Sequence, residues 1–241
     1  MVATVTHLDV VADPAALAAR VAEWMTAAAT EGEGRFRVAL SGGSTPKALY
    51  ALLASDNLRS RFPWQRVHWF WGDERFVPYD DPESNYRMAR EAMLAKAPAP
   101  PENIHPIPTD GDPEEAARRY ERILKQVYGS PTLDPARPFF DITLLGLGED
   151  GHTASLLPGD ELLDERQRWV AAVLHGRPEI RITLTYPLLE SSRHVAFLVA
   201  GKGKAATLRR VRAGNSRLPA ARVHPVGELI WFVDRAAATE S

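Results

Sequence analysis

Short apolar runs of strand length alternate with helix-forming segments along almost all of the 241 residues. The expected strands span residues 35–40, 67–71, 139–145, 169–174, 181–185, 195–200 and 229–233. The expected helices span residues 13–30, 46–54, 84–96, 112–128 and 204–212. Because a helix between two strands returns the chain to the same edge of the sheet, this alternation predicts an α/β fold with a mainly parallel sheet flanked by helices.

The proline-rich segment 97–108 is the one candidate for a domain boundary. Its five prolines favour a rigid extended connection over a helix or a strand. The segments on either side of it each contain only half of a sheet. We therefore expect residues 1–241 to form a single α/β domain.

Composition and charge exclude several classes of protein. The chain has no cysteine, which excludes disulfides, thiolate metal sites and cysteine nucleophiles. Its formal net charge of -2 argues against binding to nucleic acid or to an anionic membrane surface, since both require a large basic field. Residues 1–11 lack the pattern of a signal peptide, and no segment reaches the roughly 20 apolar residues of a membrane span. A cytoplasmic protein is therefore expected.

The first candidate site is the sequence SGGSTP, which follows the first expected strand. Gly42 and Gly43 let backbone N–H groups surround an anion, and Ser44 and Thr45 add hydroxyl donors. We expect Thr45 to cap the next helix and Pro46 to occupy its first position, so that the helix N-terminus also favours negative charge. The lysine spacing of a Walker P-loop and the pattern GxGxxG are both absent. The alternative is a capped turn that binds nothing.

A second candidate follows the apolar strand 67–71, where the sequence reads Gly72-Asp73-Glu74-Arg75. Ligands of open parallel sheets bind beyond the carboxyl ends of the strands, where this loop is expected to lie. Arg75 is suited to binding a phosphate or stabilising an oxyanion. The alternative is an exposed ion pair between Asp73 and Arg75 that contributes under about 1 kcal/mol.

The third candidate is the glycine-rich sequence GLGEDGH, which ends at His152 and follows strand 139–145. An imidazole at such a turn is suited to removing a proton from water and returning it, and Asp150 is placed to hold its tautomer. The alternative is a structural or merely exposed histidine. The other six histidines are scattered, which argues against a metal site. The absence of GxSxG argues against a serine nucleophile.

The three segments SGGSTP, WGDERFVPYDDPESNY and GLGEDGHTASLLPG resemble the 6-phosphogluconolactonase family, as do RITLTYPLL and VAGKGKA further along. The resemblance covers about residues 36–205. It implies a single Rossmann-like domain of the fold shared by glucosamine-6-phosphate deaminases, ribose-5-phosphate isomerases and CoA transferases. It also implies hydrolysis of 6-phospho-D-glucono-1,5-lactone to 6-phosphogluconate, a step of the oxidative pentose phosphate pathway. No cofactor and no metal are expected, and the expected partner is the small-molecule lactone alone, bound by a monomer.

The resemblance gives each candidate residue a role. The catalytic set comprises His152 as the base, Asp150 as its support or as a contact to a sugar hydroxyl, Arg75 at the oxyanion and Asp73 at a sugar hydroxyl. The phosphate-binding set comprises Gly42, Gly43, Ser44, Thr45, Lys204 and Arg181. Arg181 begins a strand, an arrangement that can also point its side chain away from the site.

Two other functions compete with lactone hydrolysis. The deaminases resemble DGHIAFNEP where this chain has DGHTASLLP. Leu156 and Leu157 therefore stand where the deaminases have the glutamate that serves deamination. Neither leucine offers a carboxylate, which disfavours a deaminase or an aldose–ketose isomerase. A non-catalytic sugar-phosphate sensor would not need the acid–base pair of His152 and Asp150.

Overall fold

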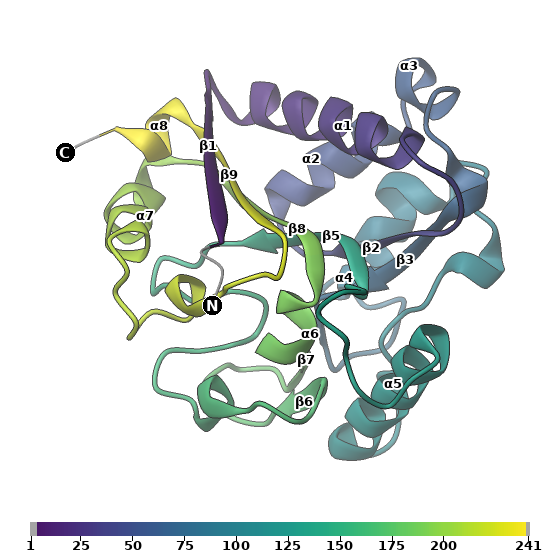
Figure 1. The fold of residues 1–241 in the computed structure, drawn as a ribbon, viewed down its shortest axis with the longest axis vertical. Helices are drawn as coiled ribbons and strands as arrows, with labels where there is room; N and C mark the ends of the chain where they lie inside the picture. Colours follow the sequence, from purple (N-terminus) through teal and green to yellow (C-terminus); the bar gives the residue numbers. More distant parts are fainter. Residues whose placement is uncertain (1–3, 240–241) are drawn as a thin grey trace.

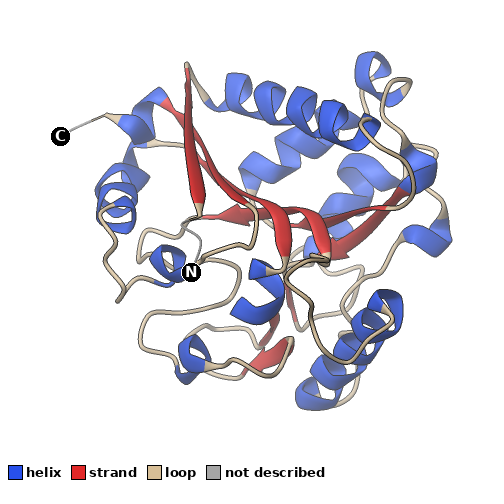
Figure 2. Ribbon diagram, in the orientation of Figure 1, coloured by secondary structure: helices blue, strands red, loops and turns tan. Residues whose placement is uncertain are grey.

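The computed structural model describes residues 4–239. Residues 1–3 and 240–241 of the expected domain, the first three of which also belong to segment 1–11, lie outside the described residues. Its centre is a six-stranded sheet in which every neighbouring pair of strands is parallel (Figures 1 and 2). The strands, in spatial order, are β1 (Val5–Val11), β9 (Glu228–Asp234), β8 (Ser192–Val199), β5 (Phe140–Gly146), β2 (Phe36–Leu40) and β3 (Val67–Trp71). The predicted α/β class with a mainly parallel sheet is confirmed.

Helices cover both faces of this sheet. Figure 1 shows α1 (Pro14–Thr30) and α2 (Ser44–Leu53) over one face, and α5 (Pro113–Tyr128) and α6 (Tyr186–Glu190) on the other. The remaining α-helices are α3 (Asp56–Arg59), α4 (Asn85–Ala89), α7 (Ala205–Arg212) and α8 (Arg235–Ala238). Single turns of 3-10 or π-helix span Trp64–Arg66, Arg90–Leu94, Pro101–Asn103, Glu161–Asp164, Lys202–Lys204 and Pro219–Arg222. None of the described helices is long and apolar enough to cross a membrane.

The two longest helices begin as their sequences predict. Asp13 precedes Pro14, and its carboxylate accepts a hydrogen bond of 2.8 Å from the N–H of Ala16. Asp112 caps α5 in the same way. An acidic cap followed by proline satisfies a free N–H and sets the backbone angle of the first turn, which explains why these starts are readable from the sequence.

A second sheet corrects the prediction for two of the strands. β6 (Val170–Val173) and β7 (Arg181–Leu184) are strands, but they pair antiparallel with each other rather than joining the parallel sheet. β4 (Asp73–Arg75), expected as a loop, pairs antiparallel with β7. The connection between β6 and β7 is too short for the helical crossover that parallel neighbours require, so the chain forms a hairpin.

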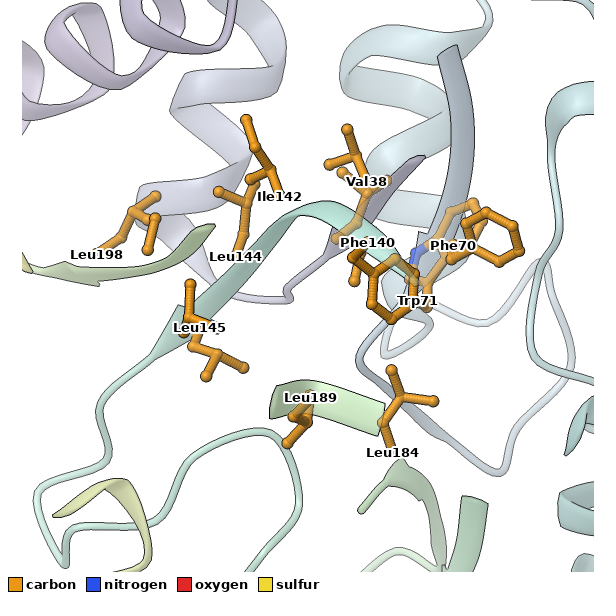
Figure 3. Packing of buried hydrophobic residues seen from close by; sticks show 14 of the residues in the cluster. Val38, Phe70, Trp71, Phe140, Ile142, Leu144, Leu145, Leu184, Leu189 and Leu198 are labelled. Carbon is orange, nitrogen blue, oxygen red and sulfur yellow. The ribbon is translucent and has the colours of Figure 1, made fainter. Parts of the chain in front are cut away.

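The first strand of the sheet was not predicted. β1 lies at the edge of the sheet, next to β9, and most of its residues are exposed. Because an edge strand buries few side chains, its sequence lacks the apolar run that marked the central strands. The central strands pack on both faces. In Figure 3, Ile142 and Leu144 of β5 point to one side of the sheet, and Leu145 points to the other.

Candidate active site

A cavity of about 310 Å³ opens beyond the carboxyl ends of the central parallel strands. Its wall combines all three candidate segments with Arg181 of β7 and the turn before α7. The lining residues include Ser41, Gly42, Gly43, Ser44, Thr45, Asp73, Arg75, Asn85, Gly148, His152, Ala154, Arg181 and Lys204. Nine of the ten residues expected to form the site therefore lie around one space, and Asp150 lies next to His152 without lining it.

The SGGST turn differs in detail from the prediction. α2 begins at Ser44, with Gly43 as its N-cap, so Thr45 does not cap the helix and Pro46 is its third residue rather than its first. The reason is Gly43, whose φ of 105° ends the extended chain two residues earlier than expected. Since no side chain of the described residues caps α2, its first N–H groups are available to an anion in the cavity.

Gly42 is in close contact with the side chain of Asn85. A Cβ on Gly42 would lie 2.1 Å from Oδ1 of Asn85, so only glycine fits there. The Asn85 amide donates a 3.0 Å hydrogen bond to the carbonyl of Asp73, and its Oδ1 accepts one of 3.2 Å from Nη1 of Arg75. Asn85 therefore joins the first glycine turn to β4. Asn85 is the first residue of α4, whose N-cap is Ser84.

Asp73 and Arg75 do not form the exposed ion pair considered as an alternative. Asp73 is 6% exposed, and its Oδ2 accepts a 2.6 Å hydrogen bond from the hydroxyl of Ser155. Arg75 donates instead to the carbonyl of Glu83 at 2.7 Å. Both side chains are thus held by neighbours while facing the cavity.

The buried carboxylate of Glu74 fixes this part of the wall. It accepts hydrogen bonds from the backbone N–H groups of Arg75, Asn85 and Tyr86 and from the hydroxyl of Ser84. Burial raises the pKa of Glu74 to about 7, although the backbone donors lower it. The carboxylate therefore ties β4 to the first turn of α4 and so positions Arg75 and Asn85.

His152 is held by Asp150 and by the absence of a side chain at Gly148. Nδ1 of His152 lies 2.5 Å from Oδ1 of Asp150. A carboxylate can only accept a hydrogen bond, so this contact requires the proton on Nδ1 and leaves Nε2 as the proton acceptor. Burial alone would raise the pKa of Asp150, but the hydrogen bonds from His152 and the charge of Arg177 outweigh it and lower that pKa to about 2.

Two cations complete the cavity. Arg181 lines it and is paired across the strands with Arg75, so the side chain does not point away from the site. Because β7 runs antiparallel to β4, its first residue lies at the end of the small sheet that meets the cavity. The Nε of Arg181 is buried without a hydrogen-bond partner among residues 4–239. Lys204 lines the cavity directly before α7.

Arg177 contacts the site but was not predicted to do so. Its Nη2 lies 2.8 Å from Oδ2 of Asp150 and 2.8 Å from Nδ1 of His152. It belongs to the connection between β6 and β7, where the sequence shows neither a glycine-rich turn after an apolar strand nor a periodic pattern. No signal in the sequence distinguishes it from an exposed loop arginine.

Comparisons with known proteins agree with this geometry. The family model described as glucosamine-6-phosphate isomerases/6-phosphogluconolactonase matches residues 12–231. A 6-phosphogluconolactonase from Nostoc sp. is 42% identical over 242 residues, covering 97% of each chain. One from Rattus norvegicus is 40% identical over 233 residues, covering 93% of this chain and 88% of the relative. The crystal structure of 6-phosphogluconolactonase from Thermotoga maritima has a TM-score of 0.82 and 31% identity, covering 95% of this chain and 100% of that one.

Proposed function

The chain belongs to the family of glucosamine-6-phosphate isomerases and 6-phosphogluconolactonases, and from this premise we propose that it hydrolyses 6-phospho-D-glucono-1,5-lactone to 6-phosphogluconate in the oxidative pentose phosphate pathway. One observation carries the choice within the family. His152, which Asp150 holds from outside the wall, shares a cavity with the SGGST turn, and among the described residues Asp73 is the only acidic side chain of that wall. Leu156 and Leu157 are buried apolar residues, so they supply no carboxylate for ring opening.

The reaction requires one proton acceptor and one oxyanion site. Nε2 of His152 removes a proton from water, and the resulting oxygen nucleophile attacks C1 of the lactone. Backbone N–H groups of the glycine turns and the guanidinium of Arg75 stabilise the tetrahedral oxyanion. When the bond from C1 to the ring oxygen breaks, His152 returns its proton to that oxygen. The products are the carboxylic acid and a free sugar hydroxyl, and no covalent enzyme intermediate is needed.

The phosphate of the substrate occupies the opposite part of the cavity. Its oxygens accept hydrogen bonds from the N–H and hydroxyl groups of Gly42, Gly43, Ser44 and Thr45 at the N-terminus of α2. Lys204 and Arg181 supply positive charge, and the unpartnered Nε of Arg181 supports this role. Asp73 accepts a hydrogen bond from a sugar hydroxyl.

We take residues 1–241 as one lactonase domain that works as a monomer in the cytoplasm. The reaction as written uses no cofactor and no metal. Among residues 4–239, no three His, Asp or Glu side chains are grouped as ligands of a metal ion.

The experiment is a direct assay with freshly prepared 6-phosphogluconolactone, in which acid release is followed and the spontaneous rate is subtracted. We expect turnover well above the spontaneous rate. The variant His152→Ala should lower kcat about 100-fold or more without unfolding the protein. Turnover of glucosamine 6-phosphate in place of the lactone would assign the deaminase function, and binding of the lactone without turnover would assign a sensor.

A further inference from the structure

We propose that Arg177 is a positioning residue, which holds the carboxylate of Asp150 and through it keeps the imidazole of His152 oriented. This inference rests on the proposed lactone hydrolysis. Two contacts carry it, the 2.8 Å distance from Nη2 of Arg177 to Oδ2 of Asp150 and the 2.8 Å distance to Nδ1 of His152. Arg177 is not among the described residues that line the cavity. It therefore acts through other residues and not on the substrate.

The first effect is on orientation. Asp150 has two carboxylate oxygens, one facing Nδ1 of His152 and one facing Arg177. With Oδ2 held by the guanidinium, the carboxylate cannot rotate without losing an ion pair, so Oδ1 stays directed at the imidazole. The imidazole is thereby kept in the tautomer whose Nε2 accepts a proton.

The second effect is on the position of the imidazole ring. Nη2 of Arg177 lies 2.8 Å from Nδ1 of His152. Because a guanidinium has only donors and Nδ1 carries the proton that it donates to Asp150, this contact joins two donors and is not a hydrogen bond. Arg177 therefore limits the space open to the ring on this side and holds it through Asp150.

The fold delivers Arg177 to this position. Gly176 has φ of 82°, and a Cβ on it would lie 2.7 Å from Cδ1 of the buried Leu157. Gly176, which directly precedes Arg177, therefore needs both a left-handed backbone and the absence of a side chain to bring the chain against the His152 turn. The same connection leads into β7, whose first residue Arg181 lines the cavity.

The test compares Arg177→Gln and Arg177→Lys with a matched control, Arg222→Gln. Arg222 forms an ion pair of 2.7 Å with Asp164 and has a side-chain exposure of 23%, close to the 27% of Arg177, but lies outside the cavity wall. Arg177→Gln should lower kcat with little change in KM. Arg177→Lys, which keeps a cation next to Asp150, should lower kcat less than Arg177→Gln.

Each outcome separates this inference from the proposed function. If the wild type hydrolyses the lactone and Arg177→Gln leaves kcat unchanged, the inference is wrong. A raised KM with an unchanged kcat would make Arg177 a substrate contact and would also overturn it. Nitrogen-15 NMR of the imidazole, assigned with His152→Ala, gives a readout besides turnover. We expect the neutral imidazole to carry its proton on Nδ1 in the wild type and to populate both tautomers in Arg177→Gln; a neutral Nε2–H form in the wild type would contradict the proposal.

Discussion

The imidazole of His152 packs directly on the backbone of Gly148, where a Cβ would lie 1.9 Å from Nδ1. The same Cβ would lie 2.6 Å from Oδ1 of Asp150. The pair of His152 and Asp150 therefore occupies the space that any side chain at position 148 would need. The backbone of Gly148 does not have a positive φ, so its own backbone angles do not require glycine. The space taken by the proposed base requires it.

Gly148→Ala should consequently act as a variant of the catalytic base. The methyl group displaces the imidazole, so we expect kcat to fall by about 100-fold or more while circular dichroism and the unfolding midpoint show a folded protein. Gly72→Ala is the matched control, since its Cβ would lie 3.5 Å from the nearest atom, an ordinary contact. Equal activities of the two variants would show that His152 does not act from its present position.

Lys204→Ala should separate binding of the phosphate from the chemistry. Loss of a charged hydrogen-bond donor is expected to raise KM for the phosphorylated lactone by about 10- to 100-fold, with a much smaller change in kcat. The KM for unphosphorylated glucono-1,5-lactone should be unaffected. Lys202 lies two residues earlier, is exposed and does not line the cavity, so Lys202→Ala serves as the control. An unchanged KM in Lys204→Ala would exclude this residue from the phosphate site.

The sequence predicted the parts of the site that follow central strands. Residues 67–71 form β3 with the expected bounds, because a strand buried on both faces has a continuous apolar run. Glycines at the ends of β2 and β5 then marked where the chain leaves the sheet, and the parallel arrangement brought those ends together. This is why nine of the ten expected residues line one cavity.

The residues that were missed depend on contacts between distant segments. Arg177 reaches Asp150 only because the β6–β7 hairpin folds back onto the His152 turn, and nothing local to its sequence encodes that return. Asn85 contacts Gly42 across 43 positions, and its role depends on the burial of Glu74. Long-range side-chain contacts of this kind have no periodic signature in the sequence.

The contact between Gly42 and Asn85 can be tested with a double-mutant cycle. Gly42→Ala should raise KM and lower kcat, because the new methyl group pushes the Asn85 amide off the carbonyl of Asp73. In an Asn85→Ala background the obstructing atoms are absent, so the same glycine substitution should cost much less. Residues in contact deviate from additivity by about 0.5–3 kcal/mol, which is measurable from kcat/KM of the four proteins. Additive effects would contradict the proposed coupling.

Glu74 should make the stability of the fold depend on pH. Burial raises its pKa in the folded protein to about 7 from the ordinary value of 4.5, so between these values the unfolded chain releases a proton that the folded protein retains. The contribution of Glu74 to the free energy of unfolding should therefore fall by about 3 kcal/mol as the pH rises through this range, and level off above it. Glu74→Gln does not titrate, so the difference between wild type and variant in urea unfolding should fall by that amount from about pH 4 to about pH 8. Whatever constant penalty the amide causes by opposing the N–H of Tyr86 cancels in this comparison. A difference that is equal at both pH values would mean that the buried carboxylate ionises as readily in the folded protein as in the unfolded chain.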